Sequence, residues 1–380
     1  MSSVLRPLTF ARTAEAITTR DPSWIGRSEL AAVSRGSRAR DQVELHDFPV
    51  IADDEYAAAF RTMVARHNRY DVRRIFMMSI PRCTLAGPQL VALWDEGYVV
   101  ETTRGAKSFR DRRVFSSDDD GYRVLAGASS VRLDEAVAPV GGAAVTGYFH
   151  WMTEIVPRLQ ALIDRGFDAL PILMRPATRA FQRQSLEWLG IEPRFVTEDL
   201  VHVERAVIPS FPLHPKRGGR YSPELIARAD AFRARWVPRR TDATPKRFYV
   251  SRRDAATRKV ANEAELEGML RAIGFECLTL SERALDEQIH LFSRADVIVA
   301  QHGAGLTNIM FARPGTRVVE LYPRGFMAPS PYWTLASHAG LDYAMLICDV
   351  DPATATRRGG VANADIVVDL TALGRLLAPR

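Results

Sequence analysis

The pattern of hydrophobic and polar positions divides most of the chain into alternating strand-like and helix-like segments. Short runs rich in β-branched and aromatic residues predict strands at 169–174, 205–209, 247–250, 275–280, 296–300 and 316–321. Helical spacing and capping signals predict helices at 177–189, from 222 towards 237, at 262–273 and at 285–293. Asn262 is the expected N-cap of the helix at 262–273, which Gly274 closes. Such alternation is typical of a parallel sheet flanked by helices, so the sequence predicts an α/β fold.

The first 140 residues give weaker signals. Residues 1–45 are rich in Arg, Ser and Ala with few apolar repeats, which favours a partly ordered arm. Strands are expected at 43–51, 73–80 and 97–101, with a helix at 54–68 between the first two. Asp118-Asp119-Asp120-Gly121 is a turn signal. We interpret it as a solvated loop, because no further metal ligands follow it.

The length of 380 residues favours two domains. The stretch from Pro238 to Pro245 is polar, has a proline at each end and lacks apolar periodicity, so it is the best linker candidate. The predicted organisation is an arm, an N-terminal α/β domain, a linker, a C-terminal α/β domain and a C-terminal helix. Their expected bounds are 1–45, 46–238, 239–246, 247–365 and 366–380.

Composition narrows the function only a little. The chain is 47% hydrophobic and 25% charged, as in ordinary globular proteins, with a net charge of +6. Its basic residues are spread along the chain and are almost all arginine, so nucleic-acid binding has no support beyond net charge. Three distant cysteines without metal spacing favour a reducing compartment. With no signal peptide or spanning segment recognised, we expect a cytoplasmic protein, and peripheral membrane contact stays open.

The stretch 295–308 has the clearest chemical signature. An apolar run ending at Gln301 predicts a buried strand, and His302-Gly303-Ala304-Gly305 then breaks it before residues that can open a helix. A strand, a glycine-rich turn and a helix point backbone N–H groups at one spot and can bind an anion. A turn with no ligand remains the alternative. Asn308 stands where a dinucleotide fingerprint needs its third glycine, and no P-loop motif is present.

Three charged residues fall on the same expected rim as this turn. Arg252 and Arg253 follow the strand at 247–250, and Glu320 lies near the end of the strand at 316–321. Arginine suits phosphate oxygens, and a carboxylate can accept from a ribose diol. Together they describe a site for a nucleotide diphosphate. Taken singly, the arginines are equally explained as solvated charges and Glu320 as a strand-end salt bridge.

A second candidate region is the glycine-rich loop at 141–147 and the helix that follows it. His150, Glu154 and Arg158 are four residues apart and share one helix face. They form a catalytic or acceptor-binding wall, or else a surface ladder of charge pairs. The basic loop at 211–220 either covers a cleft or merely connects two elements.

At this point the residues resemble glycosyltransferase family 61, over roughly 145–325. The motifs that carry the resemblance are Tyr148-Phe149-His150-Trp151 with Glu154, Pro157 and Arg158, then 248–253, Arg258, 262–265, 274–275, 287–288, 295–299, 302–308 and 314–320.

The resemblance implies a GT-B-like architecture, in which two Rossmann-like, doubly wound domains face a cleft. It implies inverting transfer from a nucleotide-sugar donor, a UDP-sugar, to a glycan acceptor, with no metal and no cofactor. The expected base is Glu154, with His150 next, and Arg158 and Trp151 are expected on the acceptor side. The expected donor-binding residues are Arg252, Arg253, His302, Gly303, Ala304, Gly305, Leu306, Thr307, Asn308 and Glu320.

The lack of a recognised membrane anchor makes the chain look like bacterial members that build capsule or other surface polysaccharides. Two alternatives stay open. One is a non-catalytic module that binds nucleotide sugars or polyanions and needs no base. The other is a sugar-nucleotide epimerase, which needs bound NAD and is disfavoured by the incomplete glycine fingerprint.

Overall fold

The computed structural model describes residues 4–8, 40–95, 97–99, 102, 107–118, 121–142, 146–213, 220–356 and 360–378. Much of the predicted arm lies outside these ranges, as do 119–120 of the acidic turn, 143–145 of the glycine-rich loop and 214–219 of the basic loop. The chain forms two compact units. The first is Met1–Asp41 with Asp71–Arg228, and the second is Gln42–Tyr70 with Ala229–Arg380.

The first unit contains an eight-stranded sheet of order β1-β7-β6-β5-β13-β10-β11-β12. In chain order these strands are β1 (Arg6–Leu8), β5 (Met77–Ala86), β6 (Val91–Trp94), β7 (Gly97–Val99), β10 (Ser130–Pro139), β11 (Ile172–Met174), β12 (Arg194–Phe195) and β13 (Leu200–Pro209). Two further strands, β8 (Phe115–Asp118) and β9 (Gly121–Val124), form a hairpin, and η2 (Lys107–Phe109) precedes them.

The expectation of a doubly wound fold is wrong for this unit, because its sheet is mixed. Strand β10 runs parallel to β11 and β13, but β5 pairs antiparallel with both β13 and β6. The reason is local. A tight turn joins β5 to β6, with Gly87 at φ +67° and Leu90 N–H donating to the Gly87 carbonyl at 3.1 Å. Antiparallel strands need only such a turn, whereas parallel strands need a long crossover.

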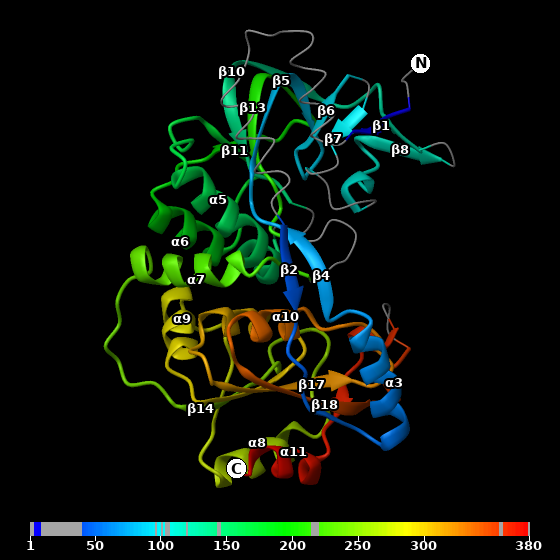
Figure 1. Ribbon diagram of the computed structural model, residues 1–380, viewed down its shortest axis with the longest axis vertical. Helices are drawn as coiled ribbons and strands as arrows, with labels where there is room; N and C mark the ends of the chain where they lie inside the picture. The colour runs from blue at the N-terminus through cyan, green and yellow to red at the C-terminus, as the bar shows by residue number, and fades with distance from the viewer. Residues whose placement is uncertain are drawn as a thin grey trace. The chain divides into compact units, whose positions relative to one another are not determined.

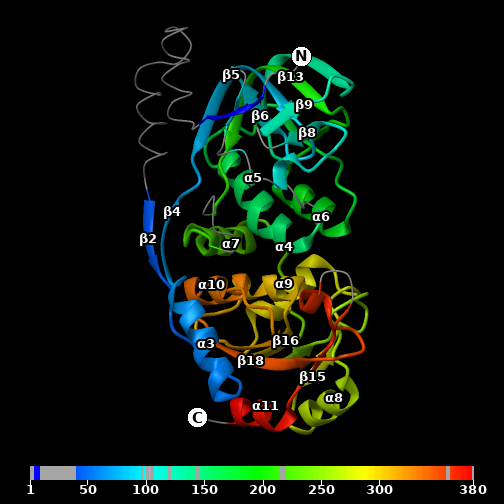
Figure 2. The same cartoon turned by 90° about the vertical axis from the view of Figure 1, so that its right-hand side faces the viewer.

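The helices of the first unit are concentrated in its second half. They are α4 (Tyr148–His150), the π-helical turn η3 (Trp151–Ile155), α5 (Val156–Ile163), α6 (Ala180–Leu189) and α7 (Glu224–Arg235), whose last residues belong to the second unit. Helices α5 and α6 lie on the β10, β11 and β13 side of the sheet (Figures 1 and 2). Helix α5 is almost wholly buried, which makes it the centre of this layer.

The second unit has the predicted doubly wound parallel sheet. Its order is β15-β14-β16-β17-β18, with β19 antiparallel at the edge of β18. The strands are β14 (Arg247–Val250), β15 (Glu276–Leu278), β16 (Val297–Gln301), β17 (Arg317–Pro323), β18 (Asp342–Val350) and β19 (Ile366–Val367). Numbered from β14, the parallel order is 2-1-3-4-5. In sheets of this order ligands bind where the order reverses, between the first and third strands.

Helices cover both faces of this sheet (Figure 1). One layer holds α8 (Glu263–Ala272) and α11 (Leu370–Leu377), and the other holds α9 (Leu285–Ser293) and α10 (Pro331–His338). Two 3₁₀ helices also belong to this unit, η4 (Ala304–Phe311) after β16 and η5 (Gly360–Asn363) before β19. Asn262 is the N-cap residue of α8, as expected, but its side chain makes no capping hydrogen bond. The Asn262 side chain instead bonds both the carbonyl and the N–H of Val368, each at 2.9 Å.

The segment 42–70 belongs to the second unit, although the sequence placed 46–70 in the N-terminal domain and the start of the C-terminal domain at 247. Strand β3 (Val50–Ile51) pairs in parallel with β18, and α3 (Asp54–Ala65) buries Phe60 against Tyr322. Strands β2 (Arg40–Glu44) and β4 (Arg69–Arg73), which pair with each other, flank this segment. Periodicity could predict α3 but not its partner, because β18 lies almost 300 residues later.

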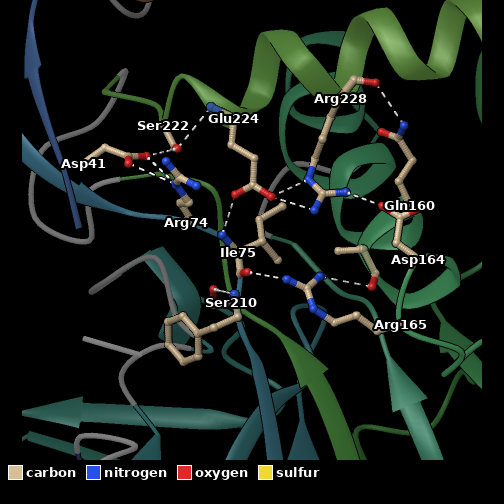
Figure 3. A network of polar contacts seen from close by, with 12 residues as sticks. Asp41, Arg74, Ile75, Gln160, Asp164, Arg165, Ser210, Ser222, Glu224 and Arg228 are labelled. Carbon is tan, nitrogen blue, oxygen red and sulfur yellow. Dashed lines mark hydrogen bonds and ion pairs between the residues drawn. The ribbon is translucent and has the colours of Figure 1, made fainter. Parts of the chain in front are cut away.

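A polar network in the first unit ties the start of α7 to the sheet and to α5 (Figure 3). One Glu224 oxygen accepts from the Ile75 N–H at 2.8 Å, and the other accepts from Arg228 Nε at 2.8 Å. Arg228 also pairs with Asp164 at the end of α5, and Arg165 donates to the Ile75 carbonyl at 3.0 Å. Glu224 is thus a shared acceptor for a backbone group and a mostly buried guanidinium.

We predict that Glu224→Ala lowers the free energy of unfolding by about 1–3 kcal/mol, because it leaves the Ile75 N–H and Arg228 Nε without the carboxylate that accepts from them. The measurement is urea denaturation of the variant beside wild type. The matched control is Glu187→Ala, at an exposed position of α6. Equal stability of the two variants would contradict this role for Glu224.

Candidate functional site

The point where the strand order reverses in the second unit lies between β14 and β16. The chain leaves β14 through Ser251 and Arg252, and it leaves β16 through His302 and Gly303. The two strands are hydrogen-bonded neighbours, with Val250 opposite Ala300. The structure therefore brings the two predicted motifs together, as their placement at strand ends required.

The Arg252 guanidinium lies directly against the backbone of Gly303. A β-carbon added at Gly303 would lie 2.2 Å from Arg252 Nη1. The Gly303 backbone is extended, with φ 170°, so conformation alone does not call for glycine there. The close approach of Arg252 does require glycine, because any side chain at residue 303 would occupy the space of the guanidinium group.

A loop that folds back from β14 holds Arg252 in place. Its Nε donates to the Arg258 carbonyl at 3.2 Å. Arg258 adopts φ 61°, in the left-handed region that is unfavourable for a non-glycine residue, so the loop has a strained turn here. Arg252 has no carboxylate partner among the described residues. Its pKa is lowered by burial and by the neighbouring charge of Arg258.

Arg258 is a site residue that the sequence reasoning did not assign to the site. It is close enough to Arg252 to affect its pKa, and its Nε is buried with no partner among the described residues. Its spacing of six residues from Arg252, in a polar loop after a strand, was the available signal. Two guanidinium groups without a carboxylate partner make this rim suited to an anion.

The turn after β16 opens η4 and offers backbone donors. At the start of this helix the Leu306 N–H donates to the Gly303 carbonyl at 3.0 Å. The N–H groups of Gly303, Ala304 and Gly305 therefore precede the hydrogen-bonded part of the helix. Gly305 also packs closely, since a β-carbon there would lie 3.0 Å from Leu280. The turn therefore has the backbone N–H groups that the predicted anion site requires.

Two of the expected donor-binding residues instead hold the turn together. Thr307 and Asn308 are fully buried. The Thr307 hydroxyl donates to the Ala304 carbonyl at 2.7 Å, and Asn308 Nδ2 donates to Gln288 Oε1 at 3.1 Å. Gln288 in turn donates to the carbonyls of the loop before α9, at 2.9 and 3.0 Å. Their side chains hydrogen-bond other groups of the protein and hold the turn in place. Direct ligand contact by these two residues is therefore not supported.

Glu320 also differs from expectation. It is completely buried, and its carboxylate accepts from His302 Nδ1, the Ser330 hydroxyl and the Tyr343 hydroxyl. Both oxygens are therefore occupied by the protein, and a ribose contact by Glu320 is wrong. The carboxylate instead orients His302, because its bond at Nδ1 fixes the ring and leaves Nε2 as the other polar atom. Burial beside Glu320 raises the pKa of Tyr343.

Arg253 points away from the Arg252 site. It forms an ion pair with Glu267 of α8, and its Nε donates to the Ser251 hydroxyl at 3.2 Å. It lines a separate polar cavity of about 540 Å³ beside β15, together with Asp254 and Glu276. Contact with the same anion as Arg252 is therefore not supported for Arg253.

A pocket of about 230 Å³ lies at the Arg252 site. Ser251, Arg252, Asp254, Ser281 and Gln301 supply its polar groups. Its apolar lining comes from Val250, Ala255, Leu280, Ala300, Gly305 and Leu306. Among the expected donor-binding residues, Arg252, Gly305 and Leu306 thus line the pocket. Gln301 was not assigned to the site from the sequence, although a polar residue ending the apolar run 297–300 was a usable signal.

His150 and Glu154, the two candidates for the base in the first unit, contact each other. His150 Nδ1 lies 2.7 Å from Glu154 Oε1, and the Glu154 side chain is 1% exposed. Glu154 lies on the π-helical turn, in which the Val156 N–H bonds the Trp151 carbonyl. Pro157 follows at the start of α5 and has no N–H to give an ordinary helical bond, which accounts for the wide turn. Such π turns are frequent at functional sites.

Arg158 and Trp151 are structural, in contrast to the acceptor contact expected for them. Arg158 is 2% exposed, donates to the Pro209 carbonyl at 2.9 Å and the Gly141 carbonyl at 2.6 Å, and stacks over Phe211. Burial lowers its pKa to about 10. Trp151 is buried, and its Nε1 donates to the Ser185 hydroxyl at 2.8 Å. Helical spacing predicted that both residues lie on this helix. It could not predict which side of the helix packs against the core.

Other features add little chemistry. Within the described ranges, no group of three or more His, Cys, Asp or Glu residues is arranged to hold a metal ion. None of the helices in those ranges has the length and apolar character needed to cross a bilayer. The cysteines are free thiols, and burial raises the pKa of Cys83 to about 12, which makes it unreactive.

With this geometry known, comparison with known proteins is informative. Residues 148–319 match the Glycosyltransferase 61 family model. The match is a little under half of the chain, begins at α4 and ends at the middle of β17. It includes the His150–Glu154 pair, the Arg252 loop and the turn after β16, and it stops one residue before Glu320.

Several curated proteins are similar to parts of this chain. The zebrafish (Danio rerio) protein O-linked-mannose beta-1,4-N-acetylglucosaminyltransferase 2 is 39% identical over 93 residues, covering 22% of this chain and 16% of its own. The Arabidopsis thaliana xylan glycosyltransferase MUCI21 is 31% identical over 117 residues, covering 30% and 23%. A rice (Oryza sativa subsp. japonica) beta-1,2-xylosyltransferase, XAX1, is 38% identical over 85 residues, covering 22% and 14%.

The chain thus spans less than a quarter of the length of these relatives. They come from a fish and two plants, so they give no support to the expected bacterial placement. The glycosyltransferase 61 resemblance inferred from the motifs is supported for the matched segment.

We predict that Glu320→Gln lowers the free energy of unfolding by about 1–3 kcal/mol, because the amide would turn a donor towards the donors that now surround the carboxylate. Chemical denaturation of the variant measures the change. Glu265→Gln, at an exposed position of α8, is the matched control and should stay within about 0.5 kcal/mol of wild type. A Glu320 variant as stable as the control would argue against the network.

Proposed function

We propose that this chain is a glycosyltransferase that moves a sugar from a nucleotide-sugar donor, a UDP-sugar, to a hydroxyl group of a glycan acceptor. The single observation that carries the proposal is the Arg252 guanidinium resting on Gly303, where the strand order of the second unit reverses. The glycosyltransferase 61 match across this region supports the same activity.

The donor diphosphate would bind at the second unit's rim. Arg252 and Arg258 supply positive charge and form no ion pair with a carboxylate among the described residues, and the turn supplies the N–H groups of Gly303, Ala304 and Gly305. His302, oriented by Glu320, adds a ring nitrogen beside the turn. These donors would stabilise the charge that develops on the leaving diphosphate, the term that is usually largest in such reactions.

Transfer itself requires one base. In the proposed step the acceptor oxygen bonds to the anomeric carbon of the donor sugar, and the bond from that carbon to the diphosphate oxygen breaks. The electron pair leaves with the nucleoside diphosphate, and the hydroxyl proton passes to Glu154, with His150 as the second candidate. Attack opposite the leaving group inverts the anomeric centre.

The finer features of the proposal come from the resemblance. They are the GT-B-like arrangement of two domains around a cleft, the inverting course and a transfer that needs no metal. The names of the relatives refer to O-linked mannose and xylan, so we infer that the acceptor here is also a carbohydrate.

We predict that Arg252→Ala lowers the affinity for a UDP-sugar by at least about 10-fold, because it removes charge-assisted hydrogen bonds to phosphate. Isothermal titration with a panel of nucleotides and nucleotide sugars, followed by a transfer assay, measures the effect. Normal donor affinity and normal turnover in a folded variant would remove Arg252 from the site. Binding without any transfer or hydrolysis by wild type would favour the non-catalytic module.

A second variant tests the geometry rather than the charge. Gly303→Ala keeps Arg252 but places a methyl group where its guanidinium lies, so the arginine must move. Donor affinity should fall towards that of Arg252→Ala while the fold is retained, since only the flexible tip of a side chain has to shift. The matched control is Gly268→Ala in α8, where an added β-carbon meets nothing within 4 Å. Equal affinities in both variants would contradict the proposed contact.

We predict that Glu154→Gln keeps donor affinity within about twofold but lowers the transfer rate by about 100-fold or more, because the isosteric amide cannot accept the proton. Titration and initial-rate measurements separate the two effects. Glu187→Gln, on the exposed face of α6, serves as the control. Unchanged turnover in Glu154→Gln would give the role of base to another residue.

A further inference from the structure

Gln301 is a buried polar residue in the pocket at the Arg252 site. It ends β16 after an otherwise apolar run and is 3% exposed. Its Nε2 donates to the Lys259 carbonyl at 3.4 Å, a long bond. Its Oε1 is buried with no partner among the described residues, and Gln301 is one of the residues that line the pocket.

The orientation of the amide follows from its surroundings. Exchanging oxygen and nitrogen would bring Oε1 to the Lys259 carbonyl, where two acceptors would face each other. Oε1 is therefore the atom left without a donor. Buried acceptors are nearly always satisfied in folded proteins, and leaving one unpaired costs free energy. A leucine or methionine would fill this position at lower cost.

A phosphate cannot satisfy Gln301. The ionised phosphates of a nucleotide diphosphate are acceptors only, and they belong with Arg252 and the turn. A ligand that satisfies Oε1 must do so with a donor on another of its parts. Val250, Leu280 and Leu306 give the pocket apolar walls, which suit the C–H faces of a sugar ring.

We propose that Gln301 Oε1 accepts a hydrogen bond from a sugar hydroxyl group of the bound ligand. The hydroxyl belongs to the ribose of the nucleotide or to the sugar that is transferred. This inference rests on the proposed function and deepens it. It makes Gln301 a specificity residue that distinguishes a nucleotide sugar from a bare diphosphate.

The test compares wild type with Gln301→Met by isothermal titration, using inorganic pyrophosphate, UDP, 2′,3′-dideoxy-UDP and UDP-N-acetylglucosamine. The affinity for UDP-N-acetylglucosamine should fall about 5–30-fold in the variant, whereas that for pyrophosphate should stay within about twofold. A loss shared by UDP but absent with dideoxy-UDP assigns the hydroxyl to ribose. A loss confined to the nucleotide sugar assigns it to the transferred sugar.

A stability measurement separates ligand recognition from a structural role. Because Oε1 has no partner in the protein, Gln301→Met should leave the unfolding temperature of the ligand-free protein unchanged or raised. Gln301→Leu is a second variant, to be measured if the methionine side chain disturbs the packing around residue 301. Gln42→Met, at an exposed strand position of the same unit, is the matched control and should bind all four probes as wild type does.

Three results would overturn the inference while the proposed function stands. They are unchanged affinities in both variants, a loss that includes pyrophosphate, and an equal loss with UDP and dideoxy-UDP, which would indicate a base N–H instead. Wild type that binds no nucleotide or nucleotide sugar would overturn the proposed function and this inference together.

Discussion

The second unit's site depends on the approach of one guanidinium group to one glycine. Arg252 can rest on the turn only because residue 303 has no side chain, and it is held there by carbonyl oxygens and not by a carboxylate. Its positive charge is therefore half-buried and has no ion-pair partner among the described residues, with Arg258 close by. Such an arrangement is unfavourable in the absence of an anion. The strained backbone at Arg258 belongs to the same loop, so the free-energy cost is concentrated where a ligand can offset it.

Each unit contains a glutamate that is buried and bonded to the Nδ1 of a histidine. Glu320 has additional donors in Ser330 and Tyr343, so its charge is stabilised wholly within the second unit. Glu154 sits on a π-helical turn of the first unit beside His150. In both pairs the carboxylate sets the orientation of the imidazole ring. The two pairs differ in the exposure of the histidine, since the His150 side chain is 30% exposed and the His302 side chain is 11% exposed.

Much of the second unit could be predicted from sequence. Its strands alternate with amphipathic helices, and residues at strand ends converge on one rim by topology alone. That argument found Arg252 and the turn at 302–305. The same argument could not predict the direction in which each side chain points, because that direction depends on packing between elements distant in sequence. Thr307, Asn308 and Glu320 point into the protein, and Arg158 and Trp151 face the core. The sequence did not predict the mixed sheet of the first unit, because strand segments look alike in sequence whether they pair parallel or antiparallel.

The placement of residues 42–70 has a consequence for folding order. Strand β3 pairs with β18, so an N-terminal segment cannot find its place until nearly the whole chain has been synthesised. Until then β3 has no strand to pair with, and Phe60 has no Tyr322 to pack against. Contacts this distant in sequence slow folding, because a long loop must close before they form. A fragment that begins at Ala229 would keep every strand that surrounds Arg252, yet it would carry a permanently open sheet edge.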